Sequence, residues 1–229
     1  MHADAVKFRN RRYSPDDREC GMKAFTPCIF AGLFVFYHTP REKEKFMNSK
    51  KVLRTAIMAM LTALSIVSLY VIRMPLIPAA PFLEYDAADI PVLIGSMLLG
   101  PVSGIVTLLA VCLIQALTVS ASSGWIGFVM HFIASSVLVL IASLIYKRKQ
   151  TTASLVVGLI VGSIAMTAVM IPLNLIFTGI FLGAGTQTVV QMLIPAIIPF
   201  NLLKAGINSA VTFAVFTPIK SILKKYVKK

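Results

Sequence analysis

The residues best suited to chemistry in this sequence are a lysine and two asparagines near the start of its last apolar run. The segment PFNLLKAGINSA contains Asn201, Lys204 and Asn208, whose spacing puts them on one face of a helix. Lys204 is the only charged residue between Lys149 and Lys220. Polar side chains are costly inside a membrane, so this face indicates a binding site. The alternative is a lysine whose ammonium group extends to the outer interface.

Asn174, near the end of the preceding apolar run, is placed to reach the same outer cavity. With Asn201 and Lys204 it offers amides and one ammonium group, and no carboxylate is expected beside them. Such a set suits a neutral ligand with carbonyl and hydroxyl groups, because an asparagine amide donates and accepts hydrogen bonds at once. Alone, Asn174 is explained equally well by a hydrogen bond between helices, and so is Gln115. His131 fits a packing residue better than a ligand contact.

A second polar segment, FLEYDAADIP, holds Glu84, Asp86 and Asp89, which are the only acidic residues after Glu44. We interpret it as the outer connection between the first two membrane helices. Asp86 or Asp89 can cap the short helix that follows or lie at its positive end. Contact with the ligand is the alternative, and these roles stay open. Ligand pockets also need apolar walls. The candidates for these walls are Phe82, Leu83, Tyr85, Phe177 and Phe200.

Sequence motifs for catalysis are missing from the chain. It contains no Walker A sequence, no HExxH and no nucleophile elbow, so nothing supports an enzyme. The cysteines show no metal-binding spacing. We therefore expect no catalytic residue, no metal and no cofactor.

The elements that position these residues are predicted to be membrane helices. The chain is 57% hydrophobic, with a mean hydropathy of +0.83, which exceeds the apolar share of soluble domains. It lacks the alternation typical of a membrane β-barrel, so we expect an all-α integral membrane protein. The apolar runs cover about 53–72, 89–99, 102–119, 125–146, 153–178 and 199–222.

Basic clusters flank these runs and account for the net charge of +13. Such clusters mark cytoplasmic ends of helices, which explains them better than a nucleic-acid partner does. The run 89–99 is too short to span a bilayer alone. If it nevertheless crosses, the basic clusters at 50–54, 147–149 and 220–229 all face the cytoplasm. The charge pattern therefore favours six crossings with both termini cytoplasmic.

Between the last two runs, GIFLGAGTQTVVQMLIPAIIP is expected outside the membrane, where it can act as a lid. Pro195 and Pro199 disfavour a continuous helix there, although Pro199 suits the first turn of the last helix. Residues 1–46 differ in composition from the rest, and we interpret them as an extension outside the fold, or as a start codon assigned too early. The membrane domain is then 47–229.

Small residues at spacings of four indicate close helix contacts. Ala59 and Ala63 form one such pair, with Ala56 one turn earlier, and Gly158 and Gly162 form another.

These motifs together resemble the riboflavin-binding S-component family of energy-coupling factor (ECF) transporters. The resemblance rests on FLEYDAADIP followed by a short helix and Gly-Pro, and on PFNLLKAGINS, and it covers about 47–229. It implies a six-helix protein of the prokaryotic cell membrane that binds riboflavin from outside. It further implies partnership with a T-component and two ATPases.

The resemblance also assigns site residues. It matches Asn201 and Lys204 to ligand contacts and Ala56, Ala59 and Ala63 to the T-component surface. Our candidate riboflavin-binding residues are Asn201, Lys204, Asn174, Leu83, Tyr85, Asp86 and Phe200. Replacing Lys204 with Met is expected to weaken binding without unfolding the protein. The alternatives are an S-component for another vitamin or a stand-alone membrane facilitator.

Overall fold

The computed structural model describes residues 42–77, 83–120, 123–183 and 185–227. Residues Asn48–Lys229 form one compact unit, separate from Met1–Met47. Almost all of the predicted extension 1–46 lies outside the described residues, as does Phe82, so the interpretation of that extension stays a prediction.

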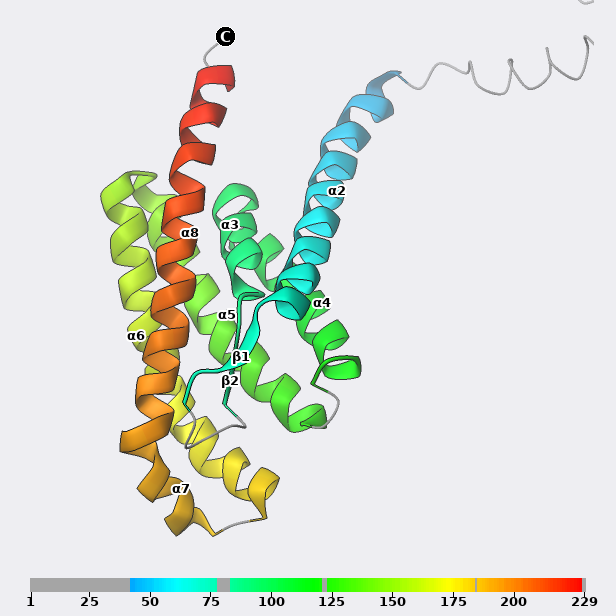
Figure 1. Cartoon of the computed structure of the whole chain (residues 1–229). Helices are drawn as coiled ribbons and strands as arrows, with labels where there is room; N and C mark the ends of the chain where they lie inside the picture. Colours follow the sequence, from blue (N-terminus) through cyan, green and yellow to red (C-terminus); the bar gives the residue numbers. More distant parts are fainter. Residues whose placement is uncertain (1–41, 78–82, 121–122, 184, 228–229) are drawn as a thin grey trace, which may run out of the picture. The chain divides into compact units, whose positions relative to one another are not determined.

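Helices make up most of the described chain (Figure 1). Four described segments are long and apolar enough to cross a membrane, namely Lys51–Val71, Gly124–Lys149, Thr152–Leu182 and Thr186–Ser221. Two shorter apolar helices lie between the first and second of them. The described helices are α2 (Glu42–Val71), α3 (Asp89–Leu99), α4 (Pro101–Leu117), α5 (Gly124–Lys149), α6 (Thr152–Leu182), α7 (Thr186–Met192) and α8 (Ile198–Val227). The chain is thus a multi-pass membrane protein, and six crossings remain a prediction.

A short antiparallel strand pair joins α2 to α3, which amends the all-α expectation. Strand β1 (Arg73–Pro75) pairs with β2 (Glu84–Asp86), and Met74 lies opposite Tyr85. The pairing satisfies backbone groups of a connection that contributes to the buried interior. Asp86 is 4% exposed, so the end of β2 lies inside the protein rather than in an open outer loop.

The corner between α3 and α4 depends on Gly100 and Pro101. Gly100 has a φ of 97°, which side chains with a Cβ rarely adopt. Pro101 begins α4, where its missing N–H costs nothing. Arg54 of α2 also holds this corner, because its guanidinium donates to the Leu99 carbonyl at 2.9 Å and to the Ser103 hydroxyl. The end of α3 is therefore capped by a side chain from another helix.

The pair Gly158 and Gly162 lets α5 and α6 pack closely, as its spacing predicts. A Cβ on Gly158 would lie 2.9 Å from the Ala142 carbonyl oxygen. A Cβ on Gly162 would lie 2.9 Å from Leu138 and 3.1 Å from its carbonyl oxygen. Backbone contacts this short exclude any larger residue, so the glycines fix the distance between the two helices.

The segment before the last helix differs from the prediction. We expected Pro195 and Pro199 to interrupt it, but α7 continues through a π-helical turn, η1 (Leu193–Ile197), directly into α8. The wider π turn accommodates Pro195 without ending the helix. Pro199 lies in the first turn of α8, as predicted. This segment packs on the strand pair in an apolar cluster of Leu83, Tyr85, Ala87, Val189, Ala196, Ile197 and Phe200.

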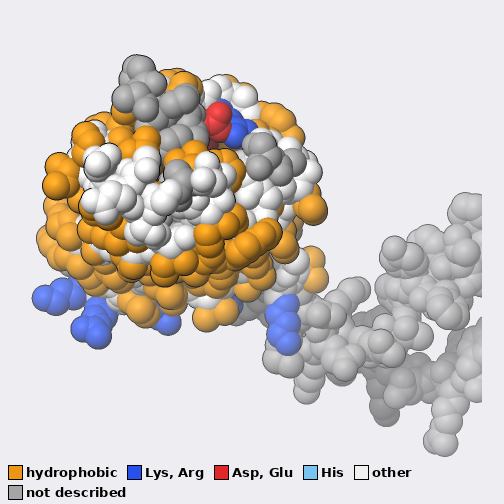
Figure 2. Space-filling view, turned by 90° about the horizontal axis from the view of Figure 1, so that it is seen from below, with side chains coloured by type: hydrophobic (Ala, Val, Ile, Leu, Met, Phe, Trp, Pro, Cys, Tyr) orange, Lys and Arg blue, Asp and Glu red, His pale blue; other side chains and the backbone are white. Residues whose placement is uncertain are grey.

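Seen from the end that carries α7 and the strand pair, hydrophobic side chains surround a more polar face (Figure 2). At the other end, the Lys220 ammonium of α8 donates to the Gln150 carbonyl at 2.6 Å. The basic cluster in the last turn of α5 and the lysine-bearing end of α8 therefore lie at the same end of the bundle, consistent with the charge pattern.

Candidate functional site

A cavity of about 310 Å³ lies among α4, α5, α6, α8 and strand β2. Its volume falls within the range of small-molecule sites, about 300–1,000 Å³. The polar groups of α6 and α8 on its wall are Asn174, Asn201 and Lys204, and Leu83 and Phe200 add apolar surface. Six of the seven predicted ligand residues, Asp86 among them, thus line one cavity, and only Tyr85 does not.

Lys204 forms a buried ion pair with Asp86. The Nζ–Oδ2 distance is 2.8 Å, and both side chains are at least nine-tenths buried. This corrects the expectation that no carboxylate lies beside Lys204. A buried ammonium group needs such a partner, because burial of an unpaired charge is strongly unfavourable. Lys204 keeps two further N–H groups for a ligand in the cavity.

Strand β2 is fixed to α8 by its other residues. The Tyr85 hydroxyl donates to Asn208 Oδ1 at 2.9 Å, and Asn208 Nδ2 donates to the Asp86 carbonyl at 3.4 Å. Burial raises the pKa of the Tyr85 phenol above its ordinary value, so it remains a donor at neutral pH. Tyr85 therefore holds strand β2, and with it Asp86, against α8. Tyr85 does not line the cavity, so its position does not favour the predicted direct ligand contact.

The two predicted asparagines differ in which of their side-chain atoms have a hydrogen-bond partner. Asn174 Nδ2 donates to the Met170 carbonyl and its Oδ1 accepts from Thr178, at 2.7 and 2.8 Å. Asn201 Nδ2 donates to the Ile197 carbonyl at 2.8 Å, but its buried Oδ1 has no partner among the described residues. A buried acceptor without a partner is costly. Asn201 is therefore the better placed of the two to accept a hydrogen bond from a ligand.

Asp89 lies in the first turn of α3, at the positive end of the helix, as one alternative predicted, but its side chain does not cap the helix. The residue before it is Ala88, and no side chain caps that helix start. The Asp89 carboxylate instead lies 3.2 Å from His131 Nε2 and accepts from the Ser135 hydroxyl at 3.0 Å. Asp86 comes nearer to a cap, accepting from the Ala88 N–H at 3.3 Å.

His131 and Ser135 are the site residues that sequence reasoning missed. Both lie on the cavity wall, and we had interpreted His131 as a packing residue. Their spacing could have indicated a polar helix face, because His131 and Ser135 are four residues apart and so lie on the same side of the helix. A carboxylate at the start of a membrane-embedded helix also requires partners from elsewhere in the bundle.

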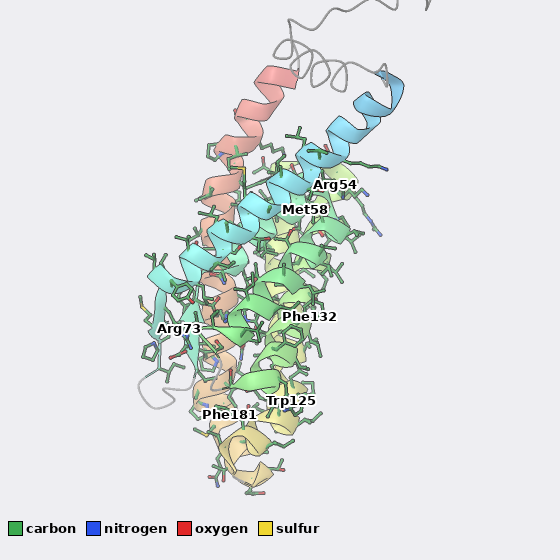
Figure 3. The ribbon with its side chains drawn as sticks, turned by 90° about the vertical axis from the view of Figure 1, so that its right-hand side faces the viewer. Arg54, Met58, Arg73, Trp125, Phe132 and Phe181 are labelled. Atoms are coloured by element: carbon green, nitrogen blue, oxygen red, sulfur yellow. The ribbon has the colours of Figure 1, made fainter. Side chains whose placement is uncertain are left out.

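The mouth of the cavity carries a second ion pair. Arg73 Nε donates to Glu84 Oε2 at 2.6 Å, and Arg73 Nη1 donates to the Val119 carbonyl at 2.7 Å. Arg73 follows α2 and lies toward the same end of the molecule as Trp125 and Phe181 (Figure 3). Arg73 of β1 thus joins strand β2 to the loop after α4 beside the cavity.

The arrangement can hold a neutral molecule that carries both donors and acceptors. The cavity's lysine and arginine each have a carboxylate partner, and amide and hydroxyl groups remain for the ligand. A family model described as "ECF transporter, substrate-specific component" matches residues 53–216. The chain belongs to this family of S-components.

Individual relatives agree with this assignment. The riboflavin transporter RibU of Streptococcus thermophilus is 34% identical over 188 residues, 79% of this chain and 88% of that protein. RibU of Staphylococcus aureus is 31% identical over 78% of this chain and 96% of its own. A solved structure reported as the S component of a bacterial ECF transporter matches with a TM-score of 0.67 and 32% identity, over 76% of this chain and 99% of that one.

Membership in the S-component family has a direct consequence. S-components are the substrate-specific parts of transporters, so this S-component is not an enzyme, as the missing catalytic motifs had indicated. The chain is the substrate-binding subunit of an ECF vitamin importer.

Proposed function

We propose that this S-component captures riboflavin from outside the cell and delivers it to an ECF importer. The observation that carries the proposal is the cavity wall of α8, which Asn201 and Lys204 both line and where the buried Asn201 oxygen has no partner among the described residues. The isoalloxazine ring of riboflavin presents an N–H between two carbonyls. Asn201 can accept from that N–H while Lys204 donates to an adjacent carbonyl. The named riboflavin transporters among the relatives support the same ligand.

The remaining walls suit a flat aromatic ring. Leu83, Met166, Met170, Phe181 and Phe200 line the cavity, and thioether and aromatic groups pack well on ring faces. Strand β2 and the α7–η1 segment pack together beside the cavity. They form the cover under which the ligand binds from outside.

Adding riboflavin to the purified protein is expected to raise its melting temperature. A ligand present at a hundred times its Kd stabilises the folded state by about 2.7 kcal/mol. The measurement is a thermal melt in detergent with riboflavin, thiamine, biotin or folate at equal concentration. Stabilisation by another vitamin and not by riboflavin would overturn the substrate assignment.

Replacing Asn201 with Leu is expected to weaken riboflavin binding about tenfold or more, because the ring N–H loses its acceptor. The substitution removes the Nδ2 bond to Ile197 and also an oxygen that has no partner among the described residues. These two effects oppose each other, so the stability of the unliganded protein is expected to change little. Isothermal titration and melts of the same preparations measure both effects. The control is Leu202→Met, since Leu202 is 45% exposed on the same helix. Unchanged affinity in the Asn201 variant would remove this residue from the site.

Uptake is proposed to require an ECF T-component and two ATPases in the cell membrane, with α2 to α6 and α8 making the six crossings and both termini cytoplasmic. Ala56, Ala59 and Ala63 lie on an exposed face of α2, which supports their proposed role as the T-component surface. Reconstituted vesicles test the partnership. Riboflavin uptake by this S-component alone would contradict it.

A further inference from the structure

The cavity has a second polar wall, opposite the one that carries Asn201 and Lys204. It is formed by the last turn of α4 and the connection to α5, where Gln115, Ser120 and Ser123 line the cavity. α4 and α8 lie apart in the bundle, with α5 and α6 following one another around it between them (Figure 1). A ligand that fills the cavity therefore meets both walls.

Gln115 is the residue on this wall whose lack of a hydrogen-bond partner indicates a ligand. Its side chain is 9% exposed, and its Oε1 atom is buried with no partner among the described residues. Its Nε2 atom is 3.5 Å from the Ser120 hydroxyl oxygen, to which it donates. The Ser123 hydroxyl is used internally, donating to the Ser120 carbonyl at 2.9 Å. The wall thus offers an acceptor at Gln115 and a hydroxyl proton at Ser120.

These groups match a polyol better than a planar ring edge. Each hydroxyl of a polyol both donates and accepts, and it needs a partner of each kind when removed from water. The α4 wall supplies one acceptor and one donor next to each other, without a formal charge. The α8 wall supplies the ammonium group and the amide oxygen that a carbonyl–N–H edge requires.

We infer that Gln115 contacts the substrate directly and accepts a hydrogen bond from a hydroxyl of its polyol side chain. The inference rests on the proposed riboflavin function and extends it, because it divides the cavity into a ring subsite at α8 and a polyol subsite at α4. Gln115 then distinguishes flavins with a polyol chain from those without one.

The test compares riboflavin with lumiflavin, which carries a methyl group in place of the polyol chain. Gln115→Met removes the acceptor with little change in size. It is expected to weaken riboflavin binding about tenfold and to change lumiflavin binding less than twofold. The matched control is Leu117→Met on the same helix, because Leu117 is 81% exposed. It is expected to change neither affinity.

A melt of the unliganded variant separates binding from a structural role. Gln115→Met removes an oxygen that has no partner among the described residues, and the only bond it removes is the long one of 3.5 Å from Nε2 to Ser120. The melting temperature is therefore expected to stay equal or rise. A fall in melting temperature, or an equal loss of both flavins, would overturn the inference while leaving riboflavin capture intact. If the unmodified protein binds neither flavin, the proposed function itself fails and the inference falls with it.

Discussion

Replacing Lys204 with Met is expected to lower the free energy of unfolding by about 3–5 kcal/mol, the usual loss when one partner of a buried ion pair is removed. Asp86, a residue that is 4% exposed in the unmodified protein, would lose the cation beside its carboxylate. From the sequence alone we predicted that this variant would bind more weakly without unfolding. The ion pair between Lys204 and Asp86 leads us to expect a loss of stability as well. Thermal or denaturant unfolding of the unliganded protein in detergent measures it.

A double variant isolates the ion pair from the rest of the site. Asp86→Asn together with Lys204→Met removes both charges, so most of the lost stability is expected to return. Riboflavin binding is not expected to return, because the ring carbonyl still lacks its donor. Leu203→Met, at a position that is 50% exposed on the same helix, is the control and should shift the melting temperature little. A double variant as unstable as the single one would show that the pair does not explain the loss.

Replacing Ala59 with Trp is expected to abolish riboflavin uptake while leaving riboflavin affinity unchanged. Ala56, Ala59 and Ala63 form an exposed small-residue face on α2, away from the residues that line the cavity. A large ring there would prevent another helix from approaching closely. Vesicle uptake with the ATPases and T-component, paired with binding to the isolated S-component, separates the two functions.

The control for Ala59 is a second exposed membrane position. Ile160 of α6 is 54% exposed, and Ile160→Trp is expected to leave uptake intact. Equal loss of uptake in both variants would mean that any bulky residue on the membrane surface blocks transport. Weaker riboflavin binding by the Ala59 variant would mean that α2 shapes the cavity itself.

The polar face of α8 was predictable because it depends on a local pattern. Asn201, Lys204 and Asn208 are all buried within the bundle, as their helical spacing indicates. Their partners were not predictable, since Asp86 and Lys204 are 118 residues apart. No periodicity within a helix encodes which strand residue meets which helix residue. The same reason explains why His131 was assigned to packing.

The uninterrupted helix from α7 to α8 was missed for a different reason. A proline removes one backbone hydrogen bond, and the sequence rule treats this loss as the end of a helix. The π turn at Leu193–Ile197 changes the hydrogen-bond register instead and keeps the chain helical around Pro195. Whether a proline ends a helix or is absorbed depends on packing, which here is supplied by the apolar cluster with Leu83 and Tyr85.

Strand β2 also limits which insertions and deletions this chain can accept. Its alternation directs Glu84 and Asp86 to Arg73 and Lys204, and it directs Tyr85 to Asn208. Deleting one residue within the strand would exchange the two faces. Both ion pairs would be lost at once, and the phenol would be turned toward the ammonium group. Residues added between Pro75 and Glu84 leave this alternation intact. Insertions and deletions among homologous sequences are therefore expected there rather than within the three residues of β2.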